Sequence, residues 1–308
     1  MSHWRTDDDA VRRAQAWADS SGRLFSSVAW GHVLGALGAQ PRYAWNEALG
    51  EGMMVPVFRR GPLKVGFLGF PVVPRCVGDL PLAFVPPLAE RLGLHIVRVN
   101  QPMAGEAVAS GLPGLVQPDA WIDDLGAWRE DASRRRVRDL AHARRAGGSL
   151  AFIEGPCAPR DLHGLYAAVV RAHRGTARYS AAYFERLLSM PGDRVRVVHA
   201  LDPQGSLAGA AVLAMDGDTG YYLHAAVSAA ARPLGVSDEL LSRLIAIARR
   251  QGLSRFNLMA SPANQPGLLR FKAKWADREG VVLTRDYGQG WLGRVAVGVN
   301  AALSRLNR

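Results

Sequence analysis

Residues 225–276 read AAVSAAARPLGVSDELLSRLIAIARRQGLSRFNLMASPANQPGLLRFKAKWA. Leucine, isoleucine and alanine residues recur at helical spacing between positions 240 and 248, which predicts an amphipathic helix with Ser237 as its N-cap. A short strand is expected at 254–259, and a second helical segment then carries the run 271–275, FKAKW. A strand–turn–helix unit presents free backbone N–H groups and a positive dipole end at its turn. The stretch therefore predicts a place for an anion or a developing oxyanion.

Lysine is rare in this chain, and two of its lysines stand in that second helical segment. The 38 Lys and Arg residues include only three lysines, Lys64, Lys272 and Lys274. Lysine is a compact point charge that loses its proton more readily than arginine when it is buried. An ammonium group is therefore a candidate functional group here. The alternative is a pair of surface lysines whose stems cover a core Phe and Trp.

The residues before this stretch predict a sheet flanked by helices. Three strand-like runs are separated by short turns of hairpin composition, at 194–201, 207–215 and 220–226. A strand at 150–154 and helices at 162–174 and 180–188 precede them. In the first half, helices are expected at 8–18, 25–37 and 80–92, and strands at 42–48, 52–59, 63–73, 94–99 and 118–122. No internal repeat is obvious.

The run GLLRFKAKW at 267–275, with Gly235, Gly252 and Phe256 before it, resembles the C-terminal part of the Fem-type aminoacyltransferases, the FemABX family, and their GNAT-fold relatives. The resemblance covers residues 120–290 well and residues 20–120 loosely. It implies an α/β (α+β) fold of tandem GNAT-like units, each a mixed, mainly antiparallel sheet flanked by helices. We therefore expect an N-terminal unit at 1–126, a C-terminal acyltransferase unit at 127–290 and an amphipathic tail at 291–308.

The resemblance also implies a reaction centre. The Phe-Lys pair of the Fem-type pattern matches Phe271 and Lys272, and the lysine there helps to stabilise charge on the aminoacyl ester and on the 3′ end of its RNA. Phe271 would give backbone or packing support. Lys274 and Trp275 are second choices, expected on the donor side.

The turn at 231–236, ARPLGV, lies where acyl-CoA-dependent GNAT enzymes keep a Gly-rich pyrophosphate loop, so Arg232, Gly235 and Val236 are predicted to bind the donor. The sequence departs from the usual Q/R-x-x-G-x-G/A loop, because Pro233 removes one N–H group and stiffens the turn. This departure counts against coenzyme A and favours a donor carried on RNA.

Arginines are predicted to contact phosphates on the acceptor side as well. The resemblance points to Arg171, Arg174 and Arg178 for this role. Tyr222 is expected either to line the cleft or, as buried tyrosines more often do, to pack in the core.

The segment 128–147 is strongly basic and is the candidate nucleic-acid-binding element. Its predicted contacts to RNA phosphates are Arg134, Arg135, Arg138 and Arg145. A solvated helix face is the alternative. Aromatic residues are not interleaved with these arginines, so stacking on unpaired bases has little support.

Composition describes a basic globular protein. Its hydrophobic content is 48%, and its net charge of +11 attracts polyanions such as nucleic acid, nucleotide diphosphates, coenzyme A or anionic lipid headgroups. An arginine-rich composition that simply raises the pI is the alternative. The first 17 residues lack an apolar signal core, so a cytoplasmic protein is expected.

The motifs that the sequence lacks narrow the chemistry. It contains no phosphate-binding P-loop, no dinucleotide-binding G-x-G-x-x-G after a strand and no G-x-S-x-G elbow. Its eight histidines are scattered, so no metal site is predicted. Acyl transfer by direct attack needs neither a covalent intermediate nor a metal, and it requires an activated ester or thioester beside an amine, with donors for the oxyanion.

The leading hypothesis is an aminoacyltransferase that moves an aminoacyl group from aminoacyl-tRNA, used as co-substrate without a further cofactor, to an amine of a peptidoglycan precursor or small natural product. The first alternative is an N-acyltransferase whose donor is acyl-CoA or a carrier protein. The second is a non-catalytic basic protein that docks on RNA or on anionic membrane. In that interpretation the tail 291–308 is a surface-lying amphipathic helix, although such a tail more often packs on its own domain.

Overall fold

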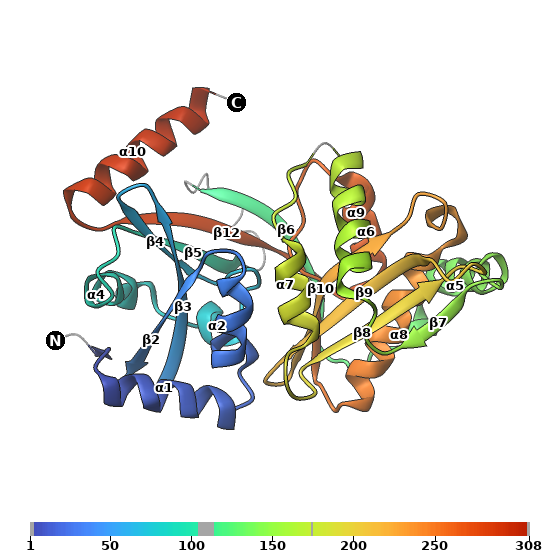
Figure 1. Cartoon of the computed structure of the whole chain (residues 1–308), viewed down its shortest axis with the longest axis horizontal. Coiled ribbons are helices and arrows are strands. Elements are labelled where there is room, and N and C mark those ends of the chain that lie inside the picture. The colour runs from blue at the N-terminus through green and yellow to red at the C-terminus, as the bar shows by residue number, and fades with distance from the viewer. Residues whose placement is uncertain (1–2, 104–113, 174, 307–308) are drawn as a thin grey trace. The chain divides into compact units, whose positions relative to one another are not determined.

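The structure is a computed structural model, and it describes residues 3–103, 114–173 and 175–306 (Figure 1). The chain folds into two compact units. The first consists of Met1–Gln117 and Gly280–Arg308, and the second of Pro118–Glu279. The boundaries expected from the sequence, after residues 126 and 290, differ from this division, for a reason that lies in the strand pairing.

The first unit contains a sheet with helices, and its order along the chain is β1 (Trp4–Arg5), α1 (Asp8–Ser20), η1 (Leu24–Ser26), α2 (Val28–Gly35), β2 (Gln40–Asn46), β3 (Glu51–Arg60), β4 (Leu63–Leu68), α3 (Arg75–Gly78), η2 (Leu82–Phe84), α4 (Val85–Arg91), β5 (Ile96–Met103), β12 (Arg278–Gly288) and α10 (Gly290–Leu306). The predicted helix at 8–18 and most strands of this half are present with small shifts at their ends. The strand predicted at 63–73 ends at Leu68, and the helix predicted at 80–92 is the 3₁₀ turn η2 followed by α4. The predicted helix 25–37 is a 3₁₀ turn followed by α2, whose N-cap is Ser27.

The second unit follows the predicted order, and its elements are β6 (Leu115–Ile122), η4 (Glu130–Ala132), α5 (Arg134–Ala146), β7 (Ala151–Glu154), α6 (Pro159–Ala172), α7 (Ala181–Leu188), β8 (Val195–Leu201), β9 (Leu207–Asp216), β10 (Thr219–Val227), η5 (Arg232–Leu234), α8 (Val236–Arg250), β11 (Arg255–Asn257) and α9 (Pro266–Trp275). The prediction of Ser237 as N-cap of α8 is wrong. Helix α8 begins at Val236, so Ser237 lies inside it and Gly235 is the N-cap. Gly235 has a φ of 74°, a left-handed conformation that glycine adopts without strain.

Both units build their strands in the same order. The first has β1-β2-β3-β4-β5-β12 and the second β7-β8-β9-β10-β11-β6. In each, an antiparallel meander is followed by one parallel pair, β4–β5 or β10–β11, and then by an antiparallel strand. The two last strands differ in origin: β12 returns to the first unit from the end of the chain, whereas β6 opens the continuous run of the second unit. The pairing of β6 with β11 and of β12 with β5 places the boundaries near 117 and 279.

Helix α8 packs its apolar stripe on one face of the second sheet. Leu240, Leu241 and Leu244 are fully buried in a cluster with Phe256 and Trp275. Burial of each such side chain stabilises the fold by about 2 kcal/mol. Helices α6 and α7 contribute to the core as well, and α7 supplies Tyr183 and Phe184. The predicted amphipathic stripe is therefore the central packing element of this unit.

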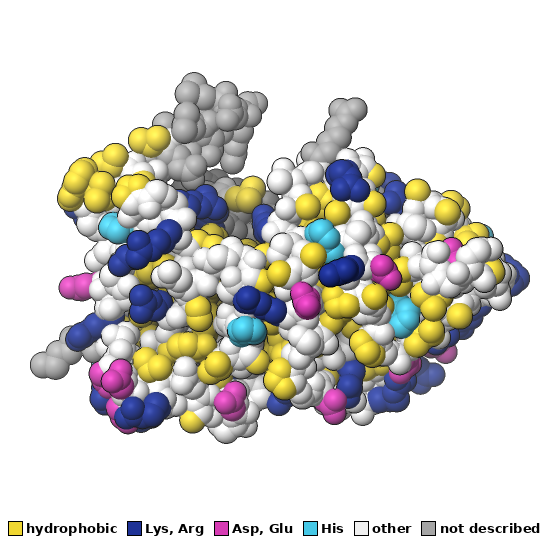
Figure 2. All heavy atoms as spheres, viewed as in Figure 1, with side chains coloured by type: hydrophobic (Ala, Val, Ile, Leu, Met, Phe, Trp, Pro, Cys, Tyr) yellow, Lys and Arg dark blue, Asp and Glu magenta, His cyan; other side chains and the backbone are white. Residues whose placement is uncertain are grey.

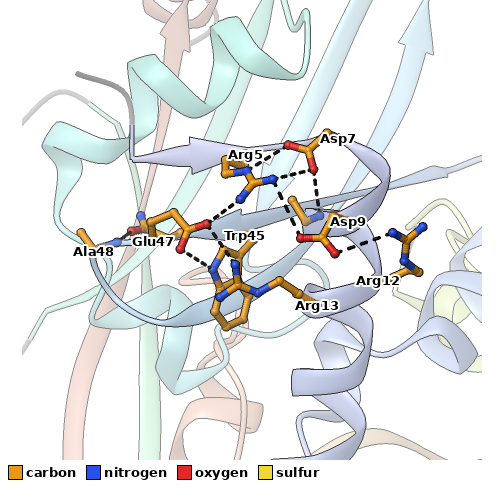
Figure 3. A network of polar contacts seen from close by, with 10 residues as sticks. Arg5, Asp7, Asp9, Arg12, Arg13, Trp45, Glu47 and Ala48 are labelled. Carbon is orange, nitrogen blue, oxygen red and sulfur yellow. Dashed lines mark hydrogen bonds and ion pairs between the residues drawn. The ribbon is translucent and has the colours of Figure 1, made fainter.

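A network of hydrogen bonds and ion pairs links the first residues of the first unit to the end of β2 (Figure 3). Asp7 caps α1 by accepting a hydrogen bond from the Ala10 N–H, and the guanidinium of Arg5, which also donates to Asp7, lowers the pKa of that carboxyl to about 2. Arg5 and Arg13 both pair with Glu47, and Trp45 Nε1 donates to the same carboxylate. The network joins α1 to the β2 end of the sheet.

Candidate active site

Strands β10 and β11 diverge after a very short parallel pairing. Their paired register runs from Thr219 opposite Arg255 to Tyr221 opposite Asn257, where β11 ends. The chain then follows β6, because the Leu258 N–H donates to Ala120 and the Ser261 N–H to Pro118. β10 continues to Val227 with a bulge between Tyr222 and His224. Beyond Asn257, β10 and the chain that leaves β11 no longer pair through backbone hydrogen bonds.

Lys272 projects from α9 to the segment that leaves β11. Its side chain is buried, with 7% exposed, and its Nζ donates a 2.7 Å hydrogen bond to the carbonyl oxygen of Met259. Burial lowers the pKa of this ammonium to about 8, against the opposing effect of the Asp119 carboxylate. One of its three N–H donors is used by Met259, which leaves two for other groups.

A short polar chain continues from this lysine to β6. The Met259 N–H donates to Asn257 Oδ1 at 2.6 Å, and Asn257 Nδ2 donates to Asp119 Oδ2 at 3.2 Å. Burial raises the pKa of Asp119 above its usual range, opposed by the hydrogen bonds of Asn257 and Ala120. Met259 has a φ of 69°, a left-handed conformation that costs a non-glycine residue about 1 kcal/mol. The polar chain holds that carbonyl toward the ammonium.

Lys274 and Trp275, predicted on the donor side, have protein partners. Lys274 Nζ lies 2.9 Å from Asp139 of α5 and 2.5 Å from Asp238 of α8. Trp275 is fully buried, and its Nε1 donates to the same Asp238 carboxylate at 2.9 Å. These contacts join α9 to α5 and α8, so both residues stabilise the fold, and a role in donor binding stays a prediction.

The turn predicted to bind the donor uses its own N–H groups. The N–H groups of Arg232, Leu234 and Gly235 donate to carbonyls of residues 228, 231 and 232. A Cβ at Gly235 would lie 3.0 Å from the Cβ of Ala143 in α5, and Val236 is fully buried. Arg232 is exposed. This geometry offers few amides to a pyrophosphate, which agrees with the departure of the sequence from the acyl-CoA loop.

Phe271 and Tyr222 lie against the same core. Tyr222 is buried in the cluster around Trp275, and burial raises its pKa well above the usual value. Phe271 is partly buried against that cluster, with Lys274 Nζ 5.5 Å from its ring centroid. Phe271 belongs to α9, and Tyr222 shares a buried cluster with Trp275 of that helix; their predicted functional roles stay predictions.

The predicted acceptor-side arginines lie at the end of α6 and before α7. Arg171 and Arg178 are exposed, and the backbone N–H of Arg178 donates to the Tyr166 hydroxyl oxygen at 3.0 Å. Arg174 lies outside the described residues. Neighbouring aromatic side chains pack around His224, whose Nε2 is 2.9 Å from the Tyr183 hydroxyl. Burial lowers the pKa of His224 to about 3, so it is neutral at physiological pH.

The predicted RNA-binding arginines share the solvent-facing side of α5. All four of them are exposed: Arg134, Arg135, Arg138 and Arg145. Arg136, on the opposite face, is buried, and it donates to the carbonyls of Glu130, Arg129 and Lys274. The helix therefore separates a structural arginine from a face of exposed ones.

Sequence reasoning missed Asp119, Asn257 and Met259, the residues that surround the Lys272 ammonium. None stands in a motif, and the nearest signal was the mixed composition of the segment 254–259. Within residues 3–103, 114–173 and 175–306, no group of three His, Cys, Asp or Glu side chains could hold a metal ion. A cavity of about 390 Å³ lies elsewhere in the unit, between β7, β8 and the end of α8, and includes none of the predicted site residues.

Comparison with known proteins identifies a family domain. A family described as "Acetyltransferase (GNAT) domain" matches residues 131–273. A search of curated proteins gave no match. Many solved structures are similar, among them three whose matches cover nearly the whole chain. FemX has a TM-score of 0.65 at 12% identity, with 94% of this chain and 98% of that chain covered.

The other two structures also cover nearly all of both chains. L-PGS from Bacillus licheniformis has a TM-score of 0.56 at 16% identity, covering 97% of both chains. The C-terminal domain (DUF2156) of a putative lysylphosphatidylglycerol synthetase from Agrobacterium fabrum has a TM-score of 0.59 at 18% identity, covering 97% of this chain and 95% of that one. At these identities the likeness establishes the fold.

The predicted fold class, α/β with tandem GNAT-like units of mixed, mainly antiparallel sheet, is therefore confirmed. Residues 131–273 thus match the acetyltransferase (GNAT) domain family, within a chain whose fold is the FemX-like tandem GNAT fold.

Proposed function

We propose that this chain is an aminoacyltransferase. It would move an aminoacyl group from aminoacyl-tRNA to an amine of a peptidoglycan precursor or small natural product, forming an amide bond. The observation that carries the proposal is the buried ammonium of Lys272 beside the diverging ends of β10 and β11. An ammonium in a site of low dielectric stabilises a developing oxyanion more strongly than it would in water.

The reaction needs only direct attack. The nitrogen lone pair of the acceptor adds to the ester carbonyl carbon, and negative charge develops on the carbonyl oxygen. Collapse of this intermediate breaks the bond between the acyl carbon and the ribose oxygen. The amine loses one proton and the ribose oxygen gains one.

The pKa of Lys272 suits this side chain to protonate the departing ribose oxygen. With a pKa of about 8, it is mostly protonated at neutral pH and can still release a proton to the departing oxygen. The carbonyl of Met259 keeps the ammonium in place, because it accepts one of its three hydrogens. The proton given up by the acceptor amine restores the ammonium.

Transfer RNA is proposed as the carrier for two reasons. The exposed arginines of α5 offer contacts to phosphates, and the turn at 231–236 leaves few free amides for a pyrophosphate. The name of one similar structure, a putative lysylphosphatidylglycerol synthetase, supports an aminoacyl donor, because the product in that name contains lysine.

An acyl-CoA donor is the second candidate, because the matched family is described as an acetyltransferase domain. The decisive experiment offers charged tRNA pools and a panel of acyl-CoAs separately, with a pooled set of amine acceptors. Mass spectrometry then reports which donor is consumed. Loss of product after ribonuclease treatment is expected. Consumption of acyl-CoA alone, with tight acyl-CoA binding in calorimetry, would replace the proposal.

A further inference from the structure

Helix α10 in the first unit has an inner face that packs on the sheet. Ala296 and Val297 contact a cluster formed by Val65, Phe67 and Ile96 of β4 and β5. Gly293 lies so close to the carbonyl of His95 that a Cβ there would clash with it. The helix is therefore held on its unit by this face.

The outer face of the same helix is apolar and exposed. Trp291, Val295 and Val299 are 68%, 57% and 54% exposed, and they recur every four residues. Leu292, which is also exposed, lies beside the first of them. Residues four apart share one side of a helix, so these side chains form a single stripe, called here the outer stripe.

The outer stripe stands out from the rest of the described surface. The other large hydrophobic residues that are exposed, such as Val28, Leu49 and Ile153, occur singly on separate elements. Figure 2 shows hydrophobic side chains gathered over α10 at the upper left of the view. Scattered apolar residues are ordinary, whereas a contiguous exposed group marks a surface that another phase or molecule covers.

Exposed arginines accompany the outer stripe. Arg294 lies on the same helix and is exposed, and the sequence from residue 287 to residue 308 contains no Asp or Glu. The β3–β4 hairpin supplies Arg59 and Arg60, both exposed. Its neighbouring residues Phe58 and Leu63 pack in the same cluster as the inner face of α10. Exposed cations thus lie on the helix that carries the stripe and on the hairpin that packs with the inner face of that helix.

We propose that the outer stripe of α10 docks the protein on an anionic lipid bilayer. A helix with apolar side chains on one side and arginines beside them lies in the plane of a membrane interface, with Trp at headgroup level. Acidic lipids complement these exposed arginines. A second copy of the chain would bring two sets of these cations together, which charge repulsion opposes. Among the described residues, no helix is long and apolar enough to cross a membrane.

The test is a vesicle co-sedimentation assay with the full chain. We expect binding to vesicles of phosphatidylcholine with about one third phosphatidylglycerol, little binding to pure phosphatidylcholine, and binding that weakens with salt. The double variant Val295→Gln/Val299→Gln is expected to lower the partition coefficient at least tenfold. Arg59→Gln and Arg60→Gln are each expected to lower it about fivefold, on the anionic vesicles only.

The matched control is Val28→Gln/Leu49→Gln, which removes two exposed apolar side chains of the same unit away from α10. It is expected to leave the partition coefficient unchanged. Equal vesicle binding by the wild type and the outer-stripe variant would overturn the proposal. So would a concentration-dependent dimer in light scattering that the outer-stripe variant abolishes, without any vesicle binding. Neither readout depends on transferase activity.

Discussion

The Nζ of Lys272 lies 2.7 Å from the carbonyl oxygen of Met259, a residue whose own N–H donates to Asn257. The lysine comes from α9, and its acceptor from the segment that leaves β11. Because Met259 has a left-handed backbone conformation, its carbonyl points differently from those of an extended strand. The backbone geometry and the buried ammonium therefore form one arrangement, and the predictions about Lys272 depend on it.

The variant Lys272→Met is expected to lower kcat for aminoacyl transfer by about 10²- to 10³-fold, because it removes the donor proposed for the oxyanion. The fold is expected to survive, since methionine fills much of the same volume. Steady-state kinetics with the donor found by mass spectrometry, and thermal melting by circular dichroism, provide the two readouts. Lys64→Met is the matched control, since Lys64 lies in the first unit. A Lys272→Met enzyme that keeps more than about a tenth of the wild-type kcat would exclude this role.

The burial of Lys272 also predicts how stability depends on pH. Its pKa is about 8 in the folded chain, against 10.5 when the side chain is unperturbed. Between these values the unfolded state binds more protons, so this group makes the free energy of unfolding rise with pH, by about 3 kcal/mol in all. Below pH 8 the full cost of burying the charge is present, and above about 10.5 it is gone.

Urea unfolding of wild type and Lys272→Met at several pH values between about 7.5 and 10 measures this contribution. The difference in unfolding free energy between the two proteins should change across that window, in favour of the wild type as pH rises. Because both proteins contain the same tyrosines, the effect of tyrosine titration on the free energy of unfolding cancels in this difference. A constant difference would mean that Lys272 has an ordinary pKa in the folded protein.

Lys274 differs from Lys272 in what its removal should do. Its ammonium is shared by Asp139 and Asp238, so Lys274→Met leaves two partly buried carboxylates without that cation. The free energy of unfolding is expected to fall by about 3 kcal/mol. The double variant Lys274→Met/Asp238→Asn should recover part of this loss. Urea unfolding checks both, and a variant with unchanged stability but a raised KM for the donor would instead favour the donor-binding role.

The sequence was sufficient to predict most of the local elements. The helical stripe at 240–248 and the hairpins of β8, β9 and β10 follow from short-range patterns. The scarcity of lysine pointed to Lys272 and Lys274 together, and the family resemblance selected Lys272, whose catalytic role stays a prediction. The surroundings of Lys272 were out of reach, because Asp119 lies 138 residues before Asn257 and meets it only through the pairing of β6 with β11. The division into units also depends on long-range pairing, because β6 joins the second unit by pairing with β11 and β12 joins the first by pairing with β5.

The sequence also could not predict that Lys272 and Lys274 have different partners. The sequence places Lys272 and Lys274 two residues apart, with similar surroundings in the chain. On a helix, residues two apart point about 200° away from each other, so one ammonium meets Met259 and the other meets Asp139. Which lysine would face which partner depends on how α9 is oriented in the unit, and that follows from tertiary packing.

The exposed face of α5 predicts the salt dependence of tRNA binding. Replacing its arginines by glutamine is expected to weaken binding of bulk tRNA at least tenfold at about 0.1 M salt, because each phosphate contact that is lost releases one counterion fewer. The slope of log K against log salt should become shallower by about 0.7–0.9 for each contact removed. The variant carries four substitutions: Arg134→Gln, Arg135→Gln, Arg138→Gln and Arg145→Gln.

A control of equal charge separates this face from the effect of net charge. It replaces four exposed arginines of other elements: Arg12→Gln, Arg42→Gln, Arg91→Gln and Arg160→Gln. Both variants have the same net charge, so long-range attraction falls equally in both, whereas direct phosphate contacts are lost only in the α5 variant. Fluorescence anisotropy with labelled tRNA over a salt series measures both slopes. Identical slopes would show that α5 attracts RNA only through the overall charge of the protein, because a contact surface changes the number of counterions released.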